Sequence, residues 1–144
     1  MTIRTFSLAL GILYLGLGLL GFAPPLLSAI SDSAPPLGIT AFHGYLLGLF
    51  AVNFFLNLVH MATGAWGIAA SRGAGGSRAY AKTMAVVYGL FAVMGLMPQV
   101  NTLFGLMPLY GNDVWLHAGS ALAAAFFGWV WKRSPTLHHK PLLH

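Results

Sequence analysis

Four continuous apolar runs follow one another along this chain, separated by shorter, more polar segments. They cover about residues 6–22, 50–70, 80–97 and 114–131, and the second lies within a longer apolar stretch that begins near His43. Each approaches the ~20 residues that a helix needs to cross a bilayer. Strands of a membrane barrel would be ~10 residues long and would alternate in polarity. The pattern therefore predicts an all-α, integral membrane four-helix bundle within residues 1–133.

The charges are few and lie in only some of the connections. Charged residues make up 6% of the chain, against ~25% in an ordinary soluble domain, so lipid is expected to cover most of the surface. Two connections carry no Lys or Arg and hold only Asp32 and Asp113. The basic residues precede the first run, flank the second connection or follow the fourth run: Arg4, Arg72, Arg78, Lys82, Lys132, Arg133 and Lys140. The positive-inside rule then predicts a bacterial inner (or photosynthetic) membrane with both termini cytoplasmic.

The two ends of the chain require separate interpretation. The first run follows Arg4 and ends near Ala23, as a signal peptide does. Its length and the Pro24-Pro25 pair after it favour a retained first span. Residues 134–144 contain three histidines and are expected to form a flexible cytoplasmic tail.

The second half of the chain resembles the first. A Gly precedes a His by twelve residues in both, at Gly48 and His60 and again at Gly105 and His117. The first and third runs also share a spacing of Tyr, Gly and Pro, at Tyr14, Gly21 and Pro24 and at Tyr88, Gly95 and Pro98. This indicates two similar transmembrane hairpins, related by an axis along the membrane normal. Residues 45–50 and 105–110 are expected to form interfacial segments before the second and fourth spans.

Polar residues follow a helical spacing in the second and fourth runs. The second run carries Asn53, Asn57 and His60 on one helix face, and the fourth carries Asp113, His117 and Ser120. Polar side chains facing lipid are costly, so both faces should point into the bundle. We expect His60 and His117 to approach each other, directly or through Asn57 or Asp113.

These residues have a structural and a ligand-binding interpretation. Hydrogen bonds between membrane helices contribute ~0.6 kcal/mol on average and fix helix register, and Asp113 is placed to cap the fourth helix. Alternatively, two neutral imidazoles can bind a haem iron, and one can bind the magnesium of a chlorophyll. The candidate cofactor-binding residues are then His60, His117, Asn57 and Asn53. A bare metal at His60, His117 and Asp113 is weaker because there are so few acidic residues.

Enzyme chemistry has little support in the sequence. The chain has no Cys and only two acidic residues, which excludes disulfides, thiolate metal sites and Cys nucleophiles. It contains no phosphate-binding loop and no metalloprotease motif. The scattered basic residues do not indicate nucleic-acid binding. We assign no catalytic residues.

Two segments resemble a known family. They are residues 46–53 with Asn57–His60, and residues 103–108 with Asn112–His117. Both are similar to a bacterial family of short four-span membrane proteins labelled only as a domain of unknown function, and the resemblance covers nearly the whole chain. A further His often precedes the Asn at position 57 in that family, and here the residue is Leu56. The resemblance implies the four-span fold and no activity.

Taken together, the sequence favours a non-catalytic accessory or structural subunit that contacts lipid and packs against other membrane proteins or a second copy. Haem or chlorophyll binding through His60 and His117 would fit such a role. Two alternatives remain: a small oxidoreductase component resembling the quinone-linked four-span proteins of the DoxX type, and a small transporter or channel oligomer.

Overall fold

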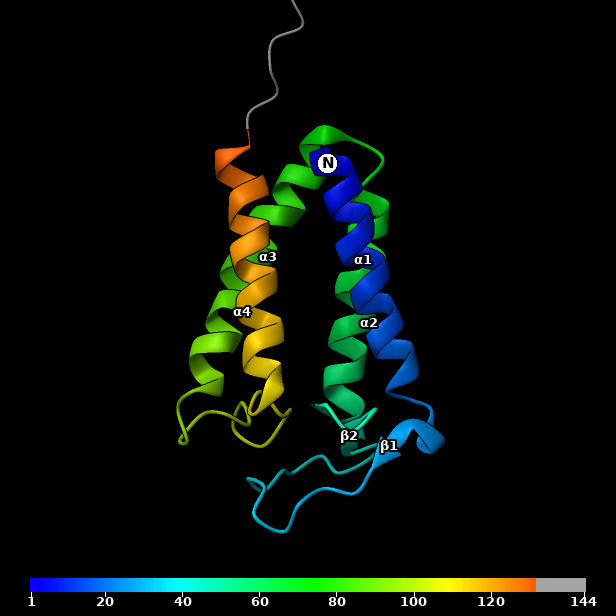
Figure 1. The fold of residues 1–144 in the computed structure, drawn as a ribbon, viewed down its shortest axis with the longest axis vertical. Coiled ribbons are helices and arrows are strands. Elements are labelled where there is room, and N and C mark those ends of the chain that lie inside the picture. Colours follow the sequence, from blue (N-terminus) through cyan, green and yellow to red (C-terminus); the bar gives the residue numbers. More distant parts are fainter. Residues whose placement is uncertain (132–144) are drawn as a thin grey trace, which may run out of the picture.

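The computed structural model describes residues 1–131, and these contain four α-helices and one small sheet (Figure 1). The helices are α1 (Ile3–Leu20), α2 (Phe54–Ala70), α3 (Ala74–Gly95) and α4 (Asn112–Ala125), and α4 continues as a π-helical turn, η2 (Phe126–Val130). A short 3-10 turn, η1 (Pro24–Leu26), follows α1. The all-α class is therefore confirmed at this level. The tail predicted over residues 134–144 lies outside the described residues.

The helices form two hairpins, α1 with α2 and α3 with α4, which stand side by side in Figure 1. Glycines bring α1 and α2 into very close contact. A Cβ added at Gly11 would lie 2.7 Å from the backbone nitrogen of Ile68, and one at Gly64 would lie 2.8 Å from the carbonyl oxygen of Gly11. Small residues allow helix backbones to approach in this way.

Large aromatic side chains fill the space between the two hairpins. Phe6 of α1 stacks on Phe127 of η2 with ring centroids 4.5 Å apart. The central cluster of buried residues draws on all of α1, α3, α4 and η2, and it includes Tyr14, Tyr80 and Tyr88. Contacts within the α1–α2 hairpin are thus close and rely on small residues, whereas contacts between hairpins depend on rings.

The end of the bundle opposite the N-terminus carries three short strands that the sequence pattern did not predict. They are β1 (Leu27–Ser28), β2 (Gly44–Leu46) and β3 (Phe50–Val52), antiparallel and in that order. The segment expected as a turn before the second span is the β2–β3 hairpin. Leu47 and Gly48 in its turn have φ of 53° and 72°, which ordinary helical backbone does not adopt. This hairpin explains why the apolar stretch from His43 is longer than a single helix.

The helices do not begin where the apolar runs begin, because capping residues determine where α1 and α2 start. Asn53 caps α2 by accepting a hydrogen bond from the Leu56 amide at 2.9 Å, so the helix begins at Phe54 and not near residue 50. Thr2 caps α1 in the same way through the Thr5 amide. In contrast, α3 begins at Ala74, six residues ahead of the apolar run, after Gly73 and without a side-chain cap.

Basic side chains gather at the N-terminal end of the bundle. Arg4 Nε donates to the Ser71 carbonyl at 2.8 Å, which joins the start of α1 to the end of α2. Arg78 donates to the Trp131 carbonyl at 3.4 Å. Among the described helices, α1 is the one with both the length and the apolar composition to cross a membrane, properties that signal sequences and buried core helices share.

Candidate functional site

Two buried histidines face each other at the centre of the molecule. His60 of α2 and His117 of α4 are 1% and 0% exposed, and their ring centroids lie 6.0 Å apart. The structure therefore places the two histidines as close together as the polar faces predicted. Tyr14 lies 5.0 Å from His60, Tyr88 lies 5.0 Å from His117, and the two tyrosine rings are 4.6 Å apart. We call these four residues the Tyr–His core.

Hydrogen bonds from the two tyrosines cross between the hairpins. The Tyr14 hydroxyl donates to Ser120 Oγ of α4 at 2.8 Å. The Tyr88 hydroxyl lies 2.9 Å from Thr63 Oγ1 of α2. Because Thr63 Oγ1 already donates to the Val59 carbonyl, Tyr88 is the donor to Thr63.

The crossing bonds follow the sequence repeat. Ser120 and Thr63 each stand three residues after a histidine of the Tyr–His core, and Tyr14 and Tyr88 occupy matching positions of the first and third helices. Each hairpin thus donates its tyrosine hydroxyl to the other hairpin. The Tyr–His core therefore joins the two similar hairpins through a pair of hydrogen bonds related by pseudo-symmetry.

The imidazoles of the core carry unused hydrogen-bonding capacity. Neither Nδ1 nor Nε2 of His60 or His117 has a partner among residues 1–131, and both amide atoms of Asn57 also lack one. Buried polar atoms almost always have a partner in folded proteins, and an unpaired one calls for a water, an ion or a functional role. The imidazole nitrogens of His60 and His117 and the Asn57 amide are therefore buried groups that could still bond to a water molecule, an ion or another small ligand.

The other predicted site residues play different parts. Asn53 is not in the core: besides capping α2, its amide donates to the Ile39 and Leu106 carbonyls at 2.9 and 2.8 Å. Asn57 packs against Gly21, where any added Cβ would meet its amide. Of the four candidate cofactor-binding residues, His60 and His117 are the two that the structure places side by side in the core.

Asp113 joins the second hairpin to the sheet. Its Oδ2 accepts a hydrogen bond from the Ala51 amide of β3 at 2.8 Å, while Oδ1 has no partner among the described residues. The expectation that Asp113 caps α4 is wrong, because the helix begins after Gly111 with no side-chain cap, but Asp113 does lie in the first turn, at the positive end of the helix dipole. The side chain is fully buried in the first turn of α4.

The packing permits some ligands and not others. The ring centroids of Phe91 and His117 lie 5.6 Å apart. Together with Tyr14 and Tyr88, Phe91 encloses the two imidazoles. A tetrapyrrole between the histidines would have to displace these rings and break both crossing bonds, so haem or chlorophyll does not fit there. A three-ligand metal site at His60, His117 and Asp113 is not formed either: residues 1–131 hold no group of three or more His, Asp or Glu able to hold a metal.

The whole four-helix unit corresponds to one known family. A family model described as "Domain of unknown function (DUF4383)" matches residues 4–130. The chain belongs to this family. Comparison with curated proteins and with solved structures finds no match. The matched residues include both hairpins and the complete Tyr–His core, so the DUF4383 domain comprises nearly everything that the structure describes.

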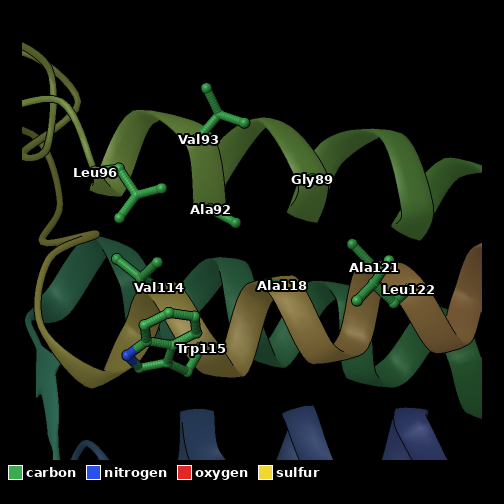
Figure 2. A pocket seen from close by; sticks show the side chains of 9 residues that line it. All are labelled: Gly89, Ala92, Val93, Leu96, Val114, Trp115, Ala118, Ala121 and Leu122. Atoms are coloured by element: carbon green, nitrogen blue, oxygen red, sulfur yellow. The ribbon is translucent and has the colours of Figure 1, made fainter.

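A second feature of this DUF4383 domain lies on its outside. An apolar groove of about 300 Å³ runs between α3 and α4 (Figure 2). Every lining residue is apolar or glycine: Gly89, Ala92, Val93, Leu96, Val114, Trp115, Ala118, Ala121 and Leu122. No feature of the sequence predicts this groove, because small residues on a helix face are equally typical of internal packing.

Proposed function

We propose that this protein is a four-span integral membrane subunit without catalytic activity, which binds a transmembrane helix of another membrane protein in the α3/α4 groove. The observation that carries the proposal is the distribution of polarity. Large apolar side chains are exposed on every helix, including Leu19, Leu58, Leu90 and Leu122. Many polar side chains of the same helices, including both core histidines, are buried, whereas Arg4, Thr5, Thr83 and Asn112 are exposed. Such an arrangement suits a surface covered by lipid.

Helix lengths are compatible with this proposal. α2 has 17 residues and α3 has 22, within the ~17–25 that a membrane helix uses. α4 reaches this range when the π-helical turn is included. The basic end, with Arg4, Arg72 and Arg78, is then proposed to face the cytoplasm of a bacterial inner membrane.

The groove is suited to a helix more than to a compact ligand. Gly89, Ala92, Ala118 and Ala121 form a floor of small residues, and helices in lipid associate through close packing at such positions. Trp115 and Leu122 are 71% and 74% exposed at its edges. These side chains would flank a helix lying between α3 and α4.

Photo-crosslinking in native membranes tests this proposal. A photoreactive amino acid is placed at Trp115 or Leu122 in the groove, and at Leu19 on α1, which is 52% exposed, as the matched control. We expect the groove positions, but not the control, to yield a discrete adduct with another membrane protein. Lipid adducts alone at all three positions would overturn the proposal, and a chain found only in the soluble fraction would overturn its membrane part.

A further inference from the structure

The centre of the Tyr–His core has the features of a metal site with two ligands. Each imidazole has two buried nitrogens without a partner in the part of the chain that the structure describes. A metal bonds an imidazole nitrogen at about 2.0–2.1 Å, so two such bonds on opposite sides of one ion place the ring centroids roughly 6 Å apart. The observed separation is 6.0 Å. We propose that His60 and His117 together bind a single Cu(I) ion between the hairpins.

The number and kind of ligands select this ion. Zn²⁺ takes four ligands in structural sites, and the described residues offer no third His, Asp or Glu in reach of such a cluster. Copper accepts imidazole ligands, and its monovalent form is stable with two nitrogen ligands in a straight line. The enclosing rings that exclude a flat macrocycle do not exclude a bare ion between the two imidazoles.

Charge also favours a monovalent ion. An ion in this interior loses its water, and the cost of burying it grows with its charge. A monovalent ion therefore leaves a smaller uncompensated charge between the hairpins than a divalent ion would.

The surrounding residues hold the two imidazoles in place. Tyr14 and Tyr88 pack on the histidine rings and are themselves fixed by their bonds to Ser120 and Thr63. Both histidines are fully buried. The ion would therefore enter as the hairpins come together during folding, and the holo protein is best obtained from copper-supplemented cells.

The test is the copper content of the full chain, expressed with copper and purified in mild detergent under a reductant. We expect one copper per chain, with an X-ray absorption edge of two-coordinate Cu(I) bonded to two nitrogens. H60Q and H117Q should each reduce the content to background. The controls are H43Q and a chain with His138, His139 and His144 replaced by Asn, and both should keep the copper.

Two results would overturn the proposal: wild-type protein without copper after this preparation, or copper that is lost with the tail histidines and kept in H60Q/H117Q. If the His variants fold poorly, the transfer of copper from the wild-type protein to a Cu(I) chelator distinguishes the two sites. A buried ion should be released only when the protein unfolds, whereas an ion bound to the tail histidines should be released at once. The outcome is independent of the crosslinking at the α3/α4 groove.

Discussion

Replacing Tyr14 or Tyr88 by Phe removes one hydroxyl and leaves the ring in place. The two changes are matched by the pseudo-symmetry of the core, but their partners differ. Thr63 still donates to the Val59 carbonyl when Tyr88 is changed. Ser120 makes no side-chain hydrogen bond within residues 1–131 other than that from Tyr14, so Tyr14→Phe leaves its hydroxyl unpaired.

The expected magnitudes follow from this difference. A hydrogen bond between membrane helices contributes about 0.6 kcal/mol on average and up to about 1.7 kcal/mol. We expect Tyr88→Phe to lower the free energy of unfolding by about 0.6 kcal/mol. Tyr14→Phe should lower it by about 1–2 kcal/mol, because burying an unpaired hydroxyl adds to the loss.

Equilibrium unfolding in mixed detergent micelles measures both values. A double-mutant cycle of Tyr14→Phe with Ser120→Ala isolates the crossing bond. We expect a coupling energy of about 0.6–1 kcal/mol in that cycle, and none between Tyr14→Phe and Thr63→Val beyond the error. A coupling energy of zero for Tyr14 with Ser120, or a larger effect of Tyr88→Phe than of Tyr14→Phe, would refute the reasoning.

Three further changes test other parts of the fold. Gly64→Ala puts a Cβ against the backbone of α1 and should destabilise by about 1–3 kcal/mol, whereas Gly16→Ala on α1 has open space and should not; equal unfolding midpoints for the two variants would contradict the close contact. Asn53→Ala removes the cap of α2 and two bonds to loop carbonyls, and circular dichroism melts should show a loss of about 1–2 kcal/mol. Asp113→Ala removes the acceptor of the buried Ala51 amide and should lower the free energy of unfolding by about 1–3 kcal/mol, because the amide loses its partner; a thermal melt indistinguishable from that of the wild type would contradict this.

The sequence predicts the helices and the His pair because both depend on spacing alone. Apolar runs of sufficient length locate the helices, and a His among apolar residues on each of two helices predicts an inward face. The sheet was missed because residues 44–52 are as apolar as a helix, and only the backbone turn at Leu47 and Gly48 separates the strands. The part played by Asp113 was also missed, because its partner is a backbone amide 62 residues away, at Ala51.

The crossing tyrosine bonds explain why the interior of this bundle is polar. In the proposed membrane location, apolar side chains would gain little from leaving the lipid for a helix interface, so packing and hydrogen bonds would have to hold the helices together. Within the α1–α2 hairpin, close contact at glycines such as Gly64 supplies the packing. Between the hairpins the gap is filled by rings, and the bonds from Tyr14 and Tyr88 fix the register. The tyrosine hydroxyls have partners across the gap and the imidazole nitrogens have none among residues 1–131, so hydrogen bonding between the hairpins accounts for Tyr14 and Tyr88 but not for His60 and His117.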